Sequence, residues 1–190
     1  MKGGQGPTEV VFKKISDNKL GVLYESCDKF LKKLQEERGT VDIISCISFA
    51  DISEITFQNQ KVKDDMWKEM IAKTNLGGST NYNTAMLNLK KLTDSNLDGI
   101  EHRDHYIHVF FMTDGQCYDD SKYEKGDTIL SKIEKFFKSH TFTFHTIGFG
   151  TDCNEGFLKG LSSKTQGIFV KPGDSIDLNL AYLKLLAKLK

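Results

Sequence analysis

The stretch HVFFMTDGQ, residues 108–116, decides the fold that the sequence predicts. It holds an uninterrupted apolar run, Val109–Met112, which ends abruptly at Thr113 and Asp114. A strand that is apolar on both faces belongs inside a sheet covered by helices. The carboxylate at its end therefore lies at the rim of the sheet, where open α/β sheets bind ligands. Two interpretations of Asp114 stay open, a ligand-binding carboxylate and a turn residue that precedes Gly115.

Strands and helices alternate along the rest of the chain. Residues 20–34 carry one apolar stripe at three- and four-residue steps, which predicts a helix that Gly39 ends. The segment 41–50 is typical of a buried strand, and the alternating segment 53–62 follows it as an edge strand in a hairpin. Further strands are expected at 106–113, 141–150 and 167–172, and further helices at 64–73, 82–92, 129–137, 154–163 and 176–187.

This order of elements predicts a doubly wound α/β fold. Strands separated by helices form a mostly parallel central sheet with helices on both faces, and the hairpin adds one antiparallel edge strand. Residues 9–190 are expected to form a single domain, because neither a repeat nor a second core pattern occurs in them. Residues 1–8 contain three glycines and a proline, and we expect them to be a flexible N-terminal segment.

The composition excludes several classes of partner. Lysine plus arginine number 26 and aspartate plus glutamate number 26, so no long-range field favours nucleic acid or an anionic membrane. No apolar run is long enough to insert into a bilayer, and the N-terminal residues lack the apolar core of a signal peptide. The four cysteines have no CxxC spacing and the chain has no N-x-S/T sequon. We therefore expect a cytoplasmic protein with four free thiols.

Four motifs, taken in order, resemble those of the von Willebrand factor A domain family. They are VDIISCISFAD (41–51), GGSTNYNTAM (77–86), HVFFMTDGQ (108–116) and FHTIGFGTDCNEGFLKGLSSKTQGIFV (144–170). Several ordered motifs are more specific than a single short one, and the resemblance covers about 20–188. It implies a Rossmann-like sheet, with strand order 3-2-1-4-5-6 if the first strand forms, and a metal-ion-dependent adhesion site on the upper face.

That site has three parts in the family, and this sequence matches two of them. Thr80 matches the threonine of the second loop, and Asp114 matches the aspartate after the fourth strand. The third part, an Asp-x-Ser-x-Ser loop after the first strand, has no match. Val10–Phe12 is the segment available for that strand, and two lysines, Lys13 and Lys14, follow it. For Thr80 an ordinary helix N-cap is the alternative interpretation.

The depleted set of ligands predicts weak or absent Mg²⁺ binding. Mg²⁺ prefers several hard oxygen ligands in near-octahedral geometry, and one carboxylate and one hydroxyl compensate little for its bound water. A nearby lysine would also repel the cation. Four further residues could add oxygen ligands, although the first two are more typical of a hairpin turn: Asp51, Ser53, Ser16 and Asp17.

The resemblance implies a protein-interaction module that binds a partner protein at the carboxyl rim of the sheet. The partner is expected to contact residues beside the metal position, namely Ser79, Gln116, Cys117 and Tyr118. No motif pairs a nucleophile with a base, so an enzyme is not expected. Two alternatives stay open. One is a structural subunit with a vestigial site, and the other is a metal-dependent hydrolase that uses Asp114, Asp51 and a rim histidine.

Two further patterns have simpler interpretations than a metal site. His102, His105 and His108 are three residues apart, but residues at that spacing in a strand face opposite sides of the sheet. We therefore expect surface or rim histidines and not a zinc site. Cys117 and Cys153 follow strands that are expected to be neighbours. Because a disulfide needs close geometry, we expect them to be unrelated loop thiols.

Overall fold

The computed structural model describes residues 19–39, 42–64, 66–73, 79–96, 106–115, 128, 131, 141–173, 175–187 and 189, and the structural statements below concern these residues. The elements, in chain order, are α2 (Lys19–Arg38), β1 (Ile43–Phe49), β2 (Ser53–Lys61), α3 (Met66–Lys73), α4 (Tyr82–Asn96), β3 (Tyr106–Thr113), β4 (Thr141–Gly148), α6 (Glu155–Ser163), β5 (Phe169–Val170) and α7 (Ser175–Leu186). The helix predicted over 129–137 lies outside the described residues.

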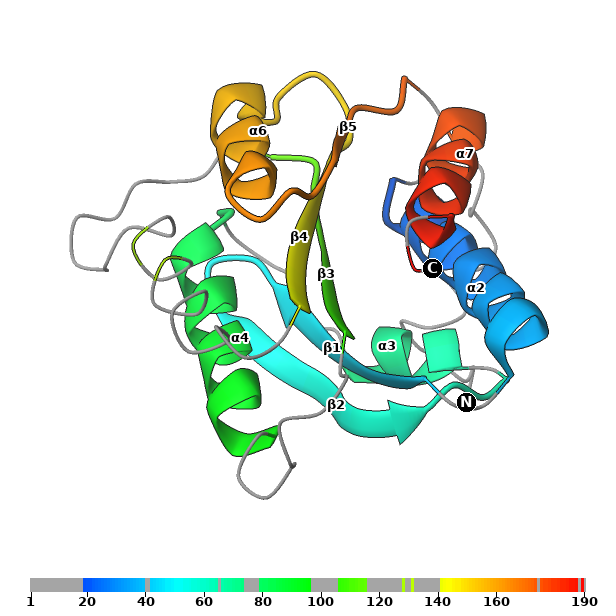
Figure 1. Cartoon of the computed structure of the whole chain (residues 1–190). Coiled ribbons are helices and arrows are strands. Elements are labelled where there is room, and N and C mark those ends of the chain that lie inside the picture. The colour runs from blue at the N-terminus through cyan, green and yellow to red at the C-terminus, as the bar shows by residue number, and fades with distance from the viewer. Residues whose placement is uncertain are drawn as a thin grey trace, which may run out of the picture.

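The described part of the chain forms three layers, with strands between two groups of helices (Figure 1). Helices α4 and α6 cover one face, where α4 contacts β1 and β2 and α6 contacts β4 and β5. Helices α2 and α7 pack against each other over the other face, and α3 contacts both α2 and β2. This arrangement is the doubly wound α/β fold that the alternation of strands and helices predicts.

The described strands form two groups. Strands β1 and β2 are an antiparallel hairpin, and β3, β4 and β5 are a parallel group in that order. In the order 3-2-1-4-5-6, a first strand stands between the counterparts of β1 and β3. The segment predicted for that strand, 10–12, lies outside the described residues. The order inside each group agrees with the prediction.

Each face of the sheet has its own hydrophobic core, and β3 contributes to both. On the α4 and α6 face the core contains Phe111, together with Tyr82, Met86, Phe144, Leu158 and Leu161. On the α2 and α7 face Phe110 and Met112 pack against a core that contains Phe30, Leu34, Ile147, Leu178, Tyr182 and Leu185. Successive side chains of a strand point to opposite faces, so a run that is apolar at every position packs against both layers.

Two strands differ from their predicted form. The segment 41–50 is expected to be buried on both faces, but β1 is only partly buried and Ile43 at its start is 63% exposed. Among the described residues β1 is paired on one edge only, by β2. The strand expected at 167–172 is reduced to the two residues of β5. Helix α2 ends as predicted, at Gly39, which has a φ of 69° and donates its amide to the Gln35 carbonyl at 2.8 Å.

Candidate functional site at the carboxyl rim of the sheet

The carboxyl rim consists of four segments that follow or precede strand ends: Ala50–Ile52, Ser79–Asn81, Thr113–Gly115 and Phe149–Asn154. Hydrogen bonds hold these segments together. The Asn81 amide donates to the Ala50 carbonyl at 2.7 Å, and the Phe149 amide donates to the Thr113 carbonyl at 2.8 Å. The Tyr82 hydroxyl donates to the Gly115 carbonyl at 2.5 Å. The first turn of α4 is thereby joined to the segment that carries Asp114.

The structure brings Thr80 and the Asp114–Gly115 segment together, although 34 positions separate Thr80 from Asp114 in the sequence. A β-carbon placed on Gly115 would stand 2.6 Å from the Thr80 hydroxyl oxygen. Such a distance is far below van der Waals contact, so the threonine side chain occupies space that only a glycine leaves open. Thr80 is half-buried and Asp114 is exposed. Thr80 and Gly115, the residue after Asp114, therefore lie next to each other on one rim.

The N-cap of α4 is Asn81 and not Thr80. The Asn81 side-chain oxygen accepts a hydrogen bond from the Asn83 amide at 3.0 Å, which is the bond that an N-cap makes to the first turn. The Thr84 hydroxyl donates to the Asn81 carbonyl at 3.0 Å. Because Asn81 satisfies the helix start, the alternative interpretation of Thr80 as an N-cap is wrong. The sequence alone could not choose between the two, since both residue types are common caps.

Asp51 and Ser53 lie on the β1–β2 turn and differ in their roles. The Asp51 carboxylate is exposed and accepts a hydrogen bond from the Ile52 amide at 3.0 Å, as a turn aspartate does. The Ser53 hydroxyl donates to the Thr84 carbonyl at 2.6 Å, and the Asn88 amide group donates to that hydroxyl at 2.8 Å. Ser53 therefore ties the hairpin to the side of α4, and its oxygen is committed to that contact.

The described rim residues include the threonine and the aspartate that match the adhesion site, Thr80 and Asp114. Thr80 contributes a hydroxyl and Asp114 a carboxylate, and Asp51 and Asp152 are further exposed carboxylates on the rim. Mg²⁺ takes near-octahedral oxygen coordination, in which one or two carboxylates are joined by water or other oxygen ligands. Within the described ranges no three histidine, cysteine, aspartate or glutamate side chains are grouped closely enough to hold a metal ion. The other candidate residues, Ser16, Asp17, Gln116, Cys117 and Tyr118, lie outside the described residues, and Ser79 is exposed.

Two of the cysteines are half-buried, with thiols that resist ionisation. Removal from water raises the pKa of Cys27 to about 11, partly offset by its contact with the Tyr182 hydroxyl, 3.3 Å away. Removal from water likewise raises the pKa of Cys46 to about 12, with a further increase from the nearby Cys27. Cys153 is buried beneath the rim, and these three cysteines are free thiols. The prediction that Cys117 and Cys153 are unrelated loop thiols is not tested, because Cys117 lies outside the described residues.

Comparison with solved structures identifies the architecture. The chain is similar to a von Willebrand factor type A protein from Catenulispora acidiphila, with a TM-score of 0.66 and 15% identity over 93% of this chain and 39% of that chain. It is also similar to proximal thread matrix protein 1 from the mussel byssus, in a structure with a zinc-occupied adhesion-site motif, with a TM-score of 0.68 and 21% identity over 92% of this chain and 44% of that chain. The chain has the von Willebrand factor A fold.

The similarity extends over nearly all of this chain but over less than half of each of those chains. A third similar structure, the ArnB paralog VWA2 from Sulfolobus acidocaldarius, has a TM-score of 0.51 and 19% identity over 95% of this chain and 42% of that chain. No protein-family model and no curated protein matches the sequence. In the described part of the chain, every helix is too short or too polar to span a membrane.

Proposed function

We propose that this von Willebrand factor A domain is a protein-interaction module that binds a partner protein at the carboxyl rim, with weak or absent Mg²⁺ binding. The observation that carries the proposal is the close approach of Thr80 to Gly115, with Asp114 exposed beside them. The arrangement presents an acidic and a hydroxyl side chain on loops that the rest of the fold holds in place. Surface loops on a rigid scaffold are where binding residues concentrate.

The rigidity of the rim supports recognition of a folded partner. The Asn81 and Phe149 amides each donate a hydrogen bond from one rim segment to another, and the Tyr82 hydroxyl donates one from the first turn of α4 to the rim. Tyr82 is fully buried, and its ring packs against Phe111 with centroids 5.2 Å apart. A rim that is already ordered loses little conformational freedom when a partner binds.

The chemistry of the rim favours a basic or hydrogen-bonding partner surface over an acidic one. A filled adhesion site would present a divalent cation to a carboxylate of the partner. Without the cation, the exposed Asp114 presents negative charge itself. A lysine or arginine side chain of the partner would complement that charge, with Thr80 and Ser79 as neighbouring hydrogen-bonding groups.

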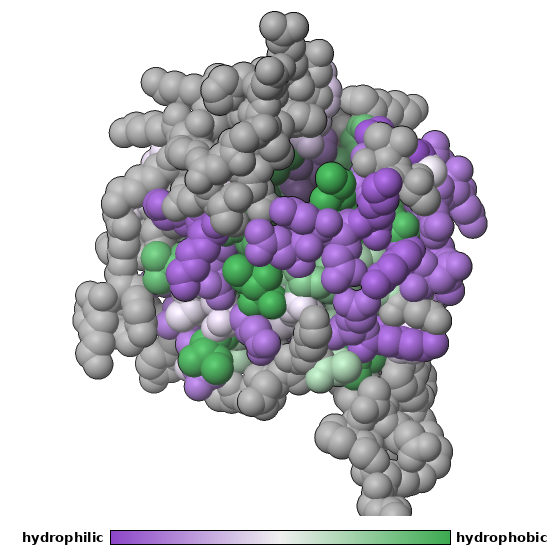
Figure 2. Space-filling view, turned by 90° about the horizontal axis from the view of Figure 1, so that it is seen from below, coloured by the Kyte–Doolittle hydropathy of each residue, from purple (hydrophilic) through white to green (hydrophobic). Residues whose placement is uncertain are grey.

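A face away from the rim offers a weaker alternative surface. Seen from below, the coloured residues are mostly hydrophilic, and the apolar ones form small separate patches (Figure 2). Isolated apolar residues are normal on the surface of a monomeric protein and do not indicate an interface.

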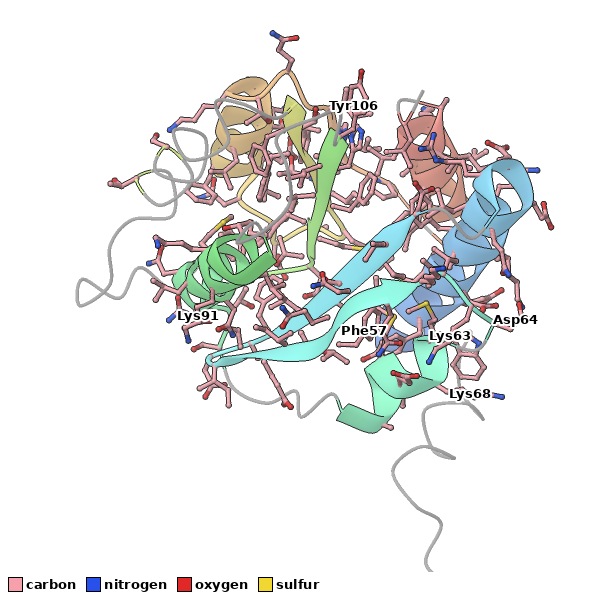
Figure 3. All side chains as sticks on the ribbon, turned by 60° about the horizontal axis from the view of Figure 1, so that its bottom comes forward. Phe57, Lys63, Asp64, Lys68, Lys91 and Tyr106 are labelled. Carbon is pink, nitrogen blue, oxygen red and sulfur yellow. The ribbon has the colours of Figure 1, made fainter. Side chains whose placement is uncertain are left out.

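The test compares partner capture by immobilised wild-type chain with capture by three variants, in buffer with and without a chelator. Asp114→Ala and Thr80→Ala should each reduce capture of the same partner several-fold. Lys91→Ala should leave it unchanged, because Lys91 projects from α4 into solvent (Figure 3). Capture that the chelator abolishes would contradict the metal-independent part of the proposal. Capture that neither rim variant changes would contradict the rim as the binding surface and favour a structural subunit.

A further inference from the structure

Two histidines form a pair on the face of the sheet that α2 and α7 cover. His108 lies in β3 two residues before Phe110, and His145 lies in β4 two residues before Ile147, so both side chains point to that face. His145 Nε2 and His108 Nδ1 are 3.4 Å apart. The rings are nearly parallel, with an interplanar angle of 12° and centroids 5.6 Å apart. His145 is 2% exposed, and His108 is half-buried.

The Ile168 amide fixes the position of the proton on His145. This amide donates a hydrogen bond to His145 Nδ1 at 3.3 Å, so Nδ1 presents its lone pair and carries no proton. A neutral imidazole then has its proton on Nε2, which donates to Nδ1 of His108. His108 in turn carries its own proton on Nε2. Side-chain hydrogen bonds thus run from His108 in β3 through His145 in β4 to Ile168, the residue just before β5.

The same geometry argues against a metal ion between the two rings. A neutral histidine that binds a metal through one nitrogen normally donates a proton from the other nitrogen to an acceptor. His145 faces an N–H donor at Nδ1, so a metal on Nε2 would leave the ring without a proton on either nitrogen. The pair is therefore suited to a proton and not to a cation.

Protonation cannot be accommodated without the loss of a hydrogen bond. The half-buried His108 is the more accessible ring, and its only unprotonated nitrogen is Nδ1. A proton added there would face the Nε2 proton of His145. His145 is buried, so an unpaired donor on its ring is costly and the ring must reorient or move its proton to Nδ1. Either change ends the acceptance of the Ile168 amide.

We infer that His108 and His145 form a proton-sensitive latch, in which protonation of His108 breaks the hydrogen bond from Ile168 to His145 and loosens β5 from β4. The latch acts on a short strand, because β5 consists of Phe169 and Val170 only. Its backbone pairing includes the bond from the Thr146 amide to the Ile168 carbonyl at 3.0 Å. The hydrogen bond from the Ile168 amide to His145 is therefore a large fraction of the hydrogen bonds that join β5 to β4.

The charges around His108 set the pH at which the latch opens. Burial lowers the pKa of His108 below its usual 6.5, and the Arg38 guanidinium lowers it further, while Asp42 opposes both effects. Arg38 and Asp42 form an ion pair with Nε and Oδ2 2.6 Å apart, and Arg38 also donates to the Leu189 carbonyl at 2.7 Å. These two, with His145, are the titratable or charged groups of the described residues that face His108. The latch should therefore open below pH 6.5.

The test follows amide hydrogen exchange by NMR between about pH 5 and 8, corrected for the intrinsic exchange rate at each pH. Protection of the Ile168 amide should fall about fivefold as pH decreases through the transition of His108, the factor that corresponds to one net hydrogen bond. The Phe149 amide is the internal control, because it follows the same strand and donates to the Thr113 carbonyl, away from the histidines. Its protection should stay constant.

Two variants assign the transition to His108. His108→Asn supplies a neutral side-chain oxygen to the Nε2 proton of His145, so protection of Ile168 should become independent of pH over the same interval. Arg38→Met removes a positive charge and leaves Asp42 unpaired, so the midpoint should move to higher pH. If His108→Asn does not fold, the wild-type and Arg38→Met midpoints still test the inference.

Three results would overturn the latch. The first is an Ile168 amide that responds to pH no more than the Phe149 amide. The second is a pH response of Ile168 that is the same in His108→Asn as in the wild-type chain. The third is an imidazole nitrogen spectrum that places the proton of neutral His145 on Nδ1.

Discussion

The side chain of Thr80 occupies the space beside the α-carbon of Gly115. A β-carbon added to Gly115 would stand 2.6 Å from the hydroxyl oxygen of Thr80 and 3.4 Å from the β-carbon of Thr80. The second distance is ordinary contact, and only the first is a clash. The threonine hydroxyl is therefore the group that leaves no room for a side chain at position 115. This relationship links the loop before α4 to the end of β3 and can be measured directly.

The first prediction concerns that match. Gly115→Ala should lower the free energy of unfolding by about 1–3 kcal/mol, because the added methyl group displaces the Thr80 side chain or shifts the loop. The same substitution in a Thr80→Ala background should cost much less, because the clashing oxygen is gone. Denaturant unfolding of the four proteins in the cycle gives the coupling energy. Equal costs in the two backgrounds would show that the side chains do not meet.

The second prediction concerns two glycines that have opposite surroundings. A β-carbon on Gly167 would stand 2.0 Å from the carbonyl oxygen of Phe144, which is backbone of β4 and cannot move aside. A β-carbon on Gly160, in the exposed part of α6, would meet nothing within 4 Å. Gly167→Ala should destabilise the domain by about 3 kcal/mol or more. Gly160→Ala should stabilise it by about 0.5–1 kcal/mol.

Thermal melts of the two glycine variants beside the wild-type chain provide the measurement. The matched design separates the effect of space from the effect of glycine itself, since both variants make the same chemical change. A Gly167→Ala variant with the same melting temperature as the wild-type chain would show that the turn before β5 does not approach β4 so closely.

The sequence predicts the ends of strands and helices well where the hydropathy pattern changes at the same residue as the burial of the side chains. β3 spans Tyr106–Thr113, as the apolar run before Asp114 predicts, and α2 ends at Gly39 as predicted. Such boundaries are encoded locally, by the change from apolar to turn residues. The extent of β5 is not encoded in this way. The apolar segment GIFV does not reveal how many of its residues find a partner on β4.

The site is less predictable than the fold because it depends on contacts between distant segments. Thr80 and Asp114 can be proposed together only through a resemblance, and the position of the α4 cap at Asn81 differs from Thr80 by a single residue. The pair of His108 and His145 depends on the register of β3 against β4, in which Phe110 stands opposite His145. No local pattern specifies that register. In the sequence alone, His108 stands out only as one of three regularly spaced histidines.

The third prediction concerns thiol reactivity. The pKa of Cys27 is raised to about 11, so at pH 8 its reactive thiolate should be roughly a hundredfold less populated than that of an unperturbed cysteine. Cys46, with a pKa of about 12, should react more slowly still. Alkylation of the native chain followed by mass spectrometry should therefore leave both residues unmodified when exposed thiols have reacted. After denaturation without reductant, all four cysteines should react, and fewer than four would indicate a disulfide.

The last prediction concerns the divalent cation. Calorimetric titration with Mg²⁺ or Mn²⁺ should show no saturable micromolar binding, because Thr80 and Asp114 provide one hydroxyl and one carboxylate, too few for either hard cation. Asp114→Ala should then leave the titration unchanged, as should Asp152→Ala, which removes another exposed rim carboxylate. Saturable micromolar binding that Asp114→Ala abolishes and Asp152→Ala preserves would contradict the depleted site. It would indicate that Ser16, Asp17 or Asp51 completes the coordination, and variants of these three residues would identify which. Binding that both aspartate variants reduce equally would instead indicate weak, non-specific attraction of the cation to exposed carboxylates, which higher ionic strength should screen away.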